Sequence, residues 1–138
     1  MAADQSQNKA KAKNTAQNTS TLEEIRATRL EKVDQLKQEG LNPYAYKWDS
    51  THHAAELQAN YADLAAGEEV ETEVAIAGRI IARRVFGKLA FFNLQDETGT
   101  IQLYLDKKRI QAQMPDLSSA FNILKKYTDV GDFLGVKG

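Results

Sequence analysis

Two side chains in the middle of this 138-residue sequence have the chemistry needed to hold a nucleic-acid base. Phe91 lies in a stretch that alternates as a β-strand does, with a parity opposite to that of the apolar residues Phe92 and Leu94. Gln102 lies in the next such stretch, opposite in parity to Ile101. A solvent-facing aromatic ring can stack on a base, and a neighbouring amide can pair with the edge of that base. The pattern therefore indicates a candidate site for an unpaired base.

Basic side chains accompany these two residues in the same part of the chain. Between residues 78 and 96 the sequence has no acid but has four basic residues, Arg79, Arg83, Arg84 and Lys88. The formal net charge of the chain is -1, so affinity for a polyanion has to come from such local clustering. We assign these cations to a nucleic acid, with Arg83 and Lys88 on its phosphates. Arg84 has the parity of the apolar side of its strand, so a bulge is needed to turn it outward.

The strand pattern by itself leaves a second function open, that of a barrel that binds other proteins. A single exposed phenylalanine is common on protein surfaces. Two adjacent arginines more often form a solvated pair than a phosphate site. Periodicity alone therefore does not decide between a nucleic-acid partner and a protein partner.

The sequence predicts no catalytic residue, no metal ligand and no cofactor site. The absence of cysteine excludes disulfides, thiolate zinc sites and thiol catalysis. His52 and His53 are adjacent, so on a helix their side chains would point about 100° apart, and no acidic pattern accompanies them. The glycines near residue 138 are not followed by the Gly-Lys-Ser/Thr of a phosphate-binding loop.

Two helices are predicted ahead of the strands. The first begins at residues 20–21, where two overlapping capping boxes occur, and ends before Gly40. Thr51 is the predicted cap of the second, which has apolar residues at helical spacing as far as Leu64. We assign residues 20–69 to this helical extension. Residues 1–19 are polar and have no apolar anchor beyond Met1, so we expect a disordered leader there.

From Val70 onward the apolar period changes from helical to two, which predicts strands. Three strands form a meander joined by short turns at 86–88 and 96–99, a helix follows at about 117–127, and a new strand begins at Val130. This order is that of an OB-fold, a five-stranded Greek-key barrel that binds oligonucleotides. Because no fifth strand follows, we expect an α+β, mostly β fold in which residues 70–138 form a truncated OB-fold without its last strand.

The same residues resemble a known family. Segments 29–32, 40–44 and 51–53 are similar to the N-terminal helical part of bacterial-type, class II lysyl-tRNA synthetases. The later part of the chain resembles the anticodon-binding domain of that family. The similarity is carried by Phe91, Gly99 and segments 77–80, 83–84, 87–88, 94–96, 101–104 and 130–133. The similarity runs from about residue 22 to 138. Aspartyl- and asparaginyl-tRNA synthetases share the barrel pattern, and the helical segments favour the lysine enzyme.

The resemblance implies roles for individual residues and for the whole protein. It implies that the central uridine of the tRNA anticodon stacks on Phe91, that Gln102 and Arg84 read its edge, and that Arg79 is a further contact. It also implies an aminoacyl-tRNA synthetase, a homodimer that uses ATP and Mg²⁺ to attach lysine to its tRNA. The catalytic domain would lie outside this sequence, so no catalytic, ATP-binding or lysine-binding residue is assigned in it.

An alternative stays open beside the enzyme. A free-standing OB-fold RNA-binding module, or a regulatory paralogue without catalytic activity, would carry the same outer face. The missing fifth strand favours a part of the enzyme over such a module. No apolar run approaches the roughly 20 residues needed to cross a bilayer, and the N-terminus lacks a secretory signal, so we expect no membrane partner and a cytoplasmic location.

Overall fold

The computed structural model of the chain describes residues 20–117 and 119–138. The predicted leader, residues 1–19, lies outside the described residues. The chain divides after Pro43 into two units, Met1–Pro43 and Tyr44–Gly138, and each is described by itself. The second predicted helix belongs to the later unit, together with the strands. The boundary between a helical extension at 20–69 and a barrel domain at 70–138 stays a prediction.

The described part of the first unit is one helix, α2 (Leu22–Gln38). It begins with the second of the two predicted capping boxes. The Thr21 hydroxyl accepts a hydrogen bond from the Glu24 amide at 3.2 Å, and the Glu24 carboxylate accepts one from the Thr21 amide at 2.8 Å. The helix ends at Gln38 with Glu39 as its C-cap, and Gly40 follows with a φ of 79°, a left-handed conformation that favours glycine. Every residue of α2 is at least partly exposed.

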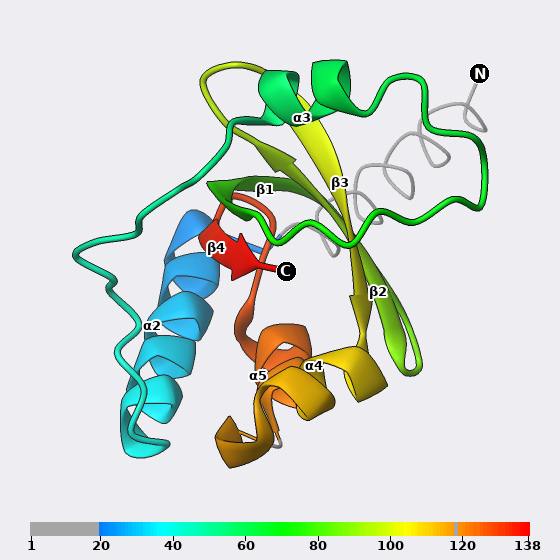
Figure 1. The fold of residues 1–138 in the computed structure, drawn as a ribbon. Coiled ribbons are helices and arrows are strands. Elements are labelled where there is room, and N and C mark those ends of the chain that lie inside the picture. Colours follow the sequence, from blue (N-terminus) through cyan, green and yellow to red (C-terminus); the bar gives the residue numbers. More distant parts are fainter. Residues whose placement is uncertain (1–19, 118) are drawn as a thin grey trace, which may run out of the picture. The chain divides into compact units, whose positions relative to one another are not determined.

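The second unit is built on a curled antiparallel sheet (Figure 1). Within the described residues it has four strands in the order β3-β2-β1-β4. Their bounds are β1 (Ala75–Phe86), β2 (Leu89–Gln95), β3 (Thr100–Asp106) and β4 (Phe133–Lys137). The tight turn between β1 and β2 is at Gly87, whose φ is 59°. The predicted fold class, N-terminal helices followed by an OB-fold without its last strand, is confirmed for these residues.

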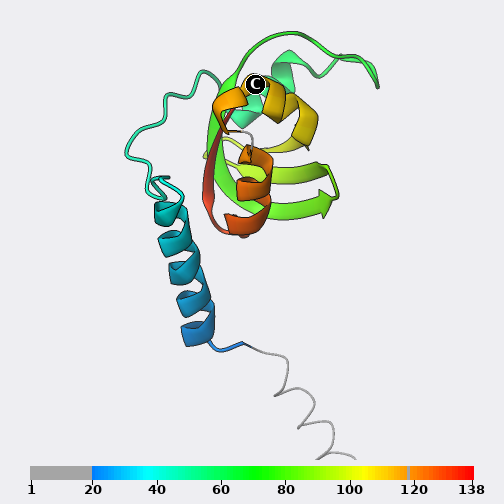
Figure 2. The same cartoon turned by 90° about the horizontal axis from the view of Figure 1, so that it is seen from below.

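Alternate residues of the strands build the core on the inner side of the curl. Ile80 and Phe92 are 0% exposed and Leu94 is 1% exposed. Helix α5 (Ala120–Tyr127) lies in the mouth of the curled sheet and buries Phe121 in this cluster (Figure 2). Burying a side chain of this size stabilises the fold by about 1.5–3 kcal/mol.

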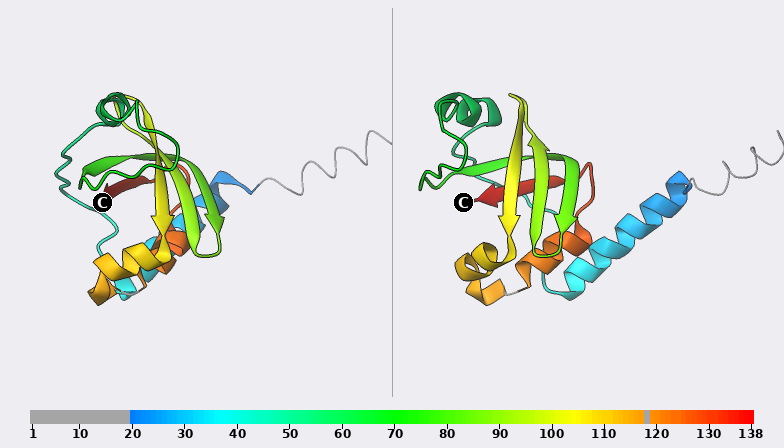
Figure 3. Two further views of the ribbon diagram at one scale, coloured as in Figure 1. Left: turned by 45° about the vertical axis from the view of Figure 1, so that its right-hand side comes forward. Right: turned by 90° about the vertical axis from the view of Figure 1, so that its right-hand side faces the viewer.

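The remaining helices lie at the two ends of the strands (Figure 3). Helix α3 (Ala54–Asn60) is at one end, and α4 (Lys107–Gln113), the 3-10 helix η1 (Pro115–Leu117) and α5 are at the other. Helix α4 is absent from the elements predicted above. It begins where Asp106 accepts hydrogen bonds from the amides of Lys108 and Arg109, at 2.7 and 3.3 Å. None of the helices among the described residues combines the length and apolar character that crossing a bilayer requires.

The prediction that Thr51 caps α3 is wrong. The N-cap residue is His53, and the first two amides of the helix donate instead to side chains of the β2–β3 turn. The Thr51 hydroxyl accepts from the amide of Ala75 at 2.8 Å and so fastens the incoming chain to the start of β1. A cap supplied from 42 residues away has no local sequence pattern, so reading the helix and its flanks could not have found it.

Candidate nucleic-acid interface

A β-bulge in β1 decides which basic side chains reach the outer face of the sheet. Ile80 pairs with Leu94, but the next pair is Ala82 with Asn93, so β1 has one extra residue at this point. An extra residue reverses the parity of everything that follows it. Arg84 therefore points outward although Ile80, four residues earlier, points inward. The bulge that an outward Arg84 requires is present.

Three residues form a lateral row across the outer face. Arg84 on β1 pairs with Phe91 on β2, which pairs with Tyr104 on β3. The rings of Phe91 and Tyr104 meet edge to face, with centroids 5.5 Å apart. Phe86 makes a second edge contact with Phe91 at 6.4 Å. These contacts orient the half-buried Phe91 ring, and the exposed residue Arg84 is its partner on the neighbouring strand.

Gln102 lies in the next row of the same face, paired with Asn93. Asn93 and Gln102 are each two residues along their strands from Phe91 and Tyr104, so the two amides form the next outward row. A diagonal neighbour of this kind is about 7–8 Å away between Cα atoms, which a glutamine side chain can span. Gln102 is exposed. The structure thus places Arg84, Phe91 and Gln102, the Phe91 patch, in adjacent positions on one face of the sheet.

Arg79 and Lys88 flank this patch on opposite sides. Arg79 is an outward residue of β1 ahead of the bulge, paired with Gln95, and its guanidinium carbon lies 4.8 Å from the centroid of the Phe133 ring. Lys88 is exposed in the turn between β1 and β2. Arg79 lies within the outer face, because β1 is an inner strand of the sheet, and Lys88 lies at the turn where the face ends. A phosphate backbone that passes along the face would meet both cations.

Arg83 is not brought to the outer face. Its strand partner is the core residue Phe92, and its guanidinium carbon lies 5.7 Å from the centroid of that ring. One guanidinium nitrogen donates a hydrogen bond to the backbone carbonyl of Lys125, near the C-terminal end of α5. A cation there also faces the negative end of the helix dipole. The same bulge that turns Arg84 outward therefore turns Arg83 inward, where it joins β1 to α5.

A further cation lies near the patch, and the sequence pattern does not single it out. The guanidinium of Arg109 in α4 lies 5.9 Å from the centroid of the Tyr104 ring. It also donates to both carboxylate oxygens of Glu69, at 3.2 and 3.4 Å, and this contact raises its pKa. Proximity of α4 to the sheet is a tertiary property, so only recognition of that helix could have pointed to this arginine.

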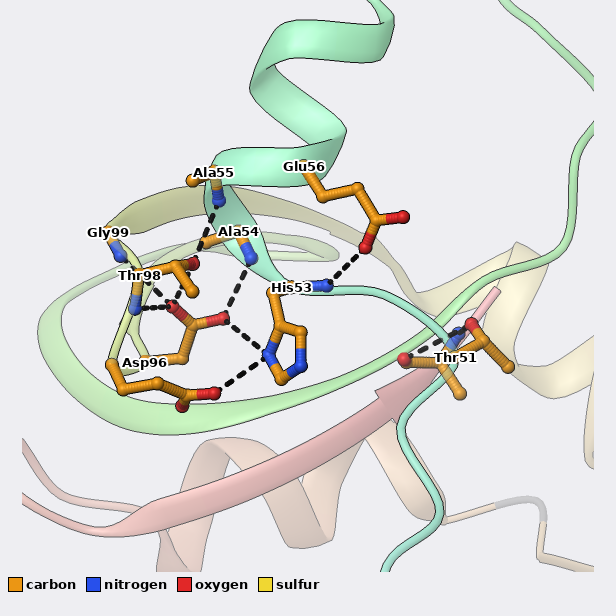
Figure 4. A network of polar contacts seen from close by, with 10 residues as sticks. Thr51, His53, Ala54, Ala55, Glu56, Asp96, Thr98 and Gly99 are labelled. Carbon is orange, nitrogen blue, oxygen red and sulfur yellow. Dashed lines mark hydrogen bonds and ion pairs between the residues drawn. The ribbon is translucent and has the colours of Figure 1, made fainter.

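A second polar cluster joins α3 to the β2–β3 turn (Figure 4). The Asp96 carboxylate accepts from the amide of Ala54 at 2.7 Å, and the Thr98 hydroxyl accepts from the amide of Ala55 at 3.0 Å. The Nδ1 atom of His53 is 3.0 Å from a carboxylate oxygen of Glu97 and 3.8 Å from one of Asp96. The acidic neighbours of His53 come from a turn distant in sequence, so no pattern around the histidine reveals them.

The Asp96 carboxylate is saturated with donors. Its other oxygen accepts from the amide and hydroxyl of Thr98 and from the amide of Gly99, at 2.7–3.0 Å. Burial of the carboxyl raises its pKa, but the hydrogen bonds from Thr98, Ala54 and Gly99 outweigh burial and lower the pKa to about 2. His53, Asp96 and Glu97 offer ligand atoms within 4.8 Å of one another. Because Asp96 already serves four donor groups, the cluster acts as a helix cap and a joint between α3 and the sheet.

Comparison with known proteins agrees with this geometry. Residues 74–138 match the family described as an OB-fold nucleic acid binding domain. The chain is 75% identical over 117 residues to the lysine–tRNA ligase of Nostoc punctiforme and 61% identical over 115 residues to that of Thermosynechococcus vestitus. It is 50% identical over 122 residues to the chloroplastic/mitochondrial lysine–tRNA ligase of Arabidopsis thaliana.

These matches include most of this chain and a small part of each relative. They cover 84%, 83% and 86% of the chain but 21%, 22% and 19% of the three relatives. The chain therefore spans about a fifth of the length of the curated relatives it matches. The resemblance to lysyl-tRNA synthetases drawn from the sequence is confirmed over this region.

Proposed function

We propose that this chain, which belongs over residues 74–138 to the family of OB-fold nucleic acid binding domains, recognises a tRNA anticodon as part of a lysine–tRNA ligase. One observation carries the proposal. The bulge in β1 sets Arg84 beside Phe91, with Gln102 one row away, on the outer face of the barrel. The 75% identity to a lysine–tRNA ligase supports tRNA as the RNA that this face meets.

The chemistry of the three side chains suits a central uridine. Phe91 offers a stacking surface that any base can use, worth about 1–3 kcal/mol. The Gln102 amide has both a donor and an acceptor and can match the adjacent carbonyl and N–H of a uracil edge. Arg84 has donors alone, so it favours the O4 carbonyl of uracil over the amino group that cytosine has in its place. Stacking supplies affinity, and the two polar groups supply the choice of base.

Further contacts belong to the same proposal. Arg79 and Lys88 are assigned to backbone phosphates, because they flank the Phe91 patch on the outer face. Arg83, which holds the α5 carbonyl, is left out of this assignment. For the whole protein we propose attachment of lysine to tRNA with ATP and Mg²⁺, by a homodimer in the cytoplasm. This chain contributes selection of the tRNA to that reaction.

Binding of anticodon stem–loop RNAs tests the proposal directly. Four RNAs that differ only in the central anticodon base would be titrated against the chain and against Phe91→Ala. We expect the variant to lose about 1–3 kcal/mol of binding free energy, because one base loses its stacking partner. Equal binding by the variant and the unaltered chain would rule out the stacking role. Tyr46→Ala, which removes another exposed aromatic, is the matched control.

Gln102→Ala tests how the base is read. We expect a smaller preference for uridine over the other three bases, with a lesser change in total affinity, because the amide contributes to selection and not to stacking. A loss that is uniform across the four RNAs would exclude edge reading by Gln102. Aminoacylation by the whole protein separates the ligase from a module that binds RNA without catalysis.

A further inference from the structure

A second aromatic–arginine pair lies on the same outer face. Phe133, the first residue of β4, is 77% exposed and pairs laterally with Arg79 on β1. The Arg79 guanidinium carbon lies 4.8 Å from the centroid of the Phe133 ring, a cation–π contact. A ring this exposed contributes little to the core. Its position repeats the arrangement of Arg84 beside Phe91, with a cation and a ring as strand neighbours.

Polar side chains lie between the Arg84–Phe91 pair and the Arg79–Phe133 pair. Arg79 pairs with Gln95, and Gln95 pairs with Thr100, so one lateral row holds an aromatic ring, a guanidinium, an amide and a hydroxyl. The next row holds Asn93 and Gln102. The face is therefore continuous from the Phe91 patch to Phe133, with hydrogen-bonding groups between the two rings.

We propose that Phe133 and Arg79 form a second stacking subsite, which takes another unpaired base of the RNA bound at Phe91. This inference rests on the proposed function and adds a subsite to the same face. The exposed side of the Phe133 ring receives the base, while Arg79, held against the ring, neutralises a neighbouring phosphate. The occupant is a single-stranded nucleotide because a base inside a helix is stacked on both faces and has none free for the ring.

The distance between the subsites sets the path of the RNA. Phe91 and Gln95 are four residues apart on β2, about 13 Å at 3.3 Å per residue, and β4 lies two strands from β2, about 10 Å across. The two subsites are therefore about 16 Å apart. Bases stacked in a helix are about 3.4 Å apart, so the two subsites hold bases that are splayed or separated by other nucleotides. The RNA crosses from β2 and β3 toward β1 and β4, and the bases between the subsites face the amides.

A native fluorescent probe lies beside Phe133. Gly135 has the same parity on β4 as Phe133, and a Cβ placed on Gly135 would lie 2.5 Å from the Trp48 ring. The Trp48 ring therefore lies on the backbone of Gly135, next to Phe133 on the outer face. Trp48 is 44% exposed and is the single tryptophan of the sequence. An RNA base at Phe133 should change its fluorescence.

The test is a cycle of protein variants against RNA variants, read by affinity and by Trp48 fluorescence. Anticodon stem–loops with one abasic loop nucleotide at a time are titrated against the full chain, Phe91→Ala, Phe133→Ala and Phe133→Tyr. We expect Phe133→Ala to bind the intact RNA about 5- to 150-fold more weakly, as loss of one stack implies. Phe133→Tyr, which keeps the ring, should bind as the unaltered chain does.

The cycle identifies the base as well as the subsite. One abasic position should weaken binding to the unaltered chain but have no effect on binding to Phe133→Ala. A different abasic position should weaken binding to the unaltered chain but have no effect on binding to Phe91→Ala. Because the two sites are more than about 10 Å apart, the double variant should lose the sum of the two free energies. Tyr46→Ala is the control for removal of an exposed ring.

The outcomes separate this inference from the proposed function. Weaker binding by Phe91→Ala with unchanged binding by Phe133→Ala would overturn the second subsite and leave anticodon recognition in place. Unchanged binding by Phe91→Ala would overturn the proposed function itself. If Phe133→Ala fails to fold, the unaltered chain still tests the subsite. A Trp48 fluorescence change that is the same for every abasic RNA, apart from the one that lacks the base at Phe91, would refute the subsite.

Discussion

Replacing Asp96 with asparagine should weaken the joint between α3 and the sheet in a pH-dependent way. The Asp96 side chain is 8% exposed and caps α3 through the amide of Ala54, at 2.7 Å. It also organises the β2–β3 turn through Thr98 and Gly99. An asparagine side chain at this position would keep one acceptor oxygen, but it would lose the negative charge and the second acceptor.

The magnitude follows from the lowered pKa of the Asp96 carboxyl. A shift from the ordinary 3.8 to about 2 corresponds to about 2 kcal/mol of stability in the ionised state. Because the folded pKa is the lower one, this stability is fully present above about pH 4 and is lost as the pH falls toward about 2. At neutral pH, Asp96→Asn should therefore lower the free energy of unfolding by about 2 kcal/mol.

Urea unfolding between neutral pH and roughly pH 2.5 measures the effect. The gap in free energy of unfolding between the unaltered chain and Asp96→Asn should be widest at neutral pH and should close as the pH approaches about 2. Glu97→Gln is the matched control, because that exposed carboxylate lies against the half-exposed His53 and does not cap α3. Two parallel curves, with a gap independent of pH, would refute the assigned role of the ionised Asp96.

Two further pairs of variants test the outward and inward positions of the basic residues and the close approach of β1 to β2. Lys88→Ala should flatten the salt dependence of RNA binding by about 0.7 in log–log slope, because it removes a phosphate contact. Arg83→Ala should leave that slope unchanged. It should instead lower the free energy of unfolding by about 1–3 kcal/mol, because the Lys125 carbonyl loses its hydrogen-bond donor. The reverse pattern would place Arg83 on the RNA. A Cβ on Gly78 would lie 2.7 Å from a backbone oxygen of β2. Gly78→Ala should therefore destabilise the barrel by about 1–3 kcal/mol, measured by thermal or urea unfolding. Gly99→Ala should destabilise it far less, because no atom lies within 4 Å of a Cβ on Gly99. Equal stability of the two glycine variants would contradict the close approach of the strands.

Local rules were sufficient for the parts of the fold whose partners are close in sequence. The Thr21–Glu24 capping box lies within one helical turn, and the parity of Phe92 and Leu94 against Phe91 follows from the two-residue period of a strand. Where the partner is distant, local rules failed. The cap of α3 comes from Asp96, and a helix cap from another segment has no signature in the helix that it serves.

The amino-acid sequence by itself determined that this chain forms a barrel with an aromatic and amide face, because alternation along each strand sorts Phe91 and Gln102 to one side without any knowledge of the partner strands. The tertiary structure decided which arginine joins them. The apolar run from Ile80 to Ala82 suits either parity, so the extra residue can be located only from the pairing of β1 with β2. That one bulge sends Arg84 to the face and Arg83 to α5. Register between strands is a property of two segments at once, and a single segment does not contain it.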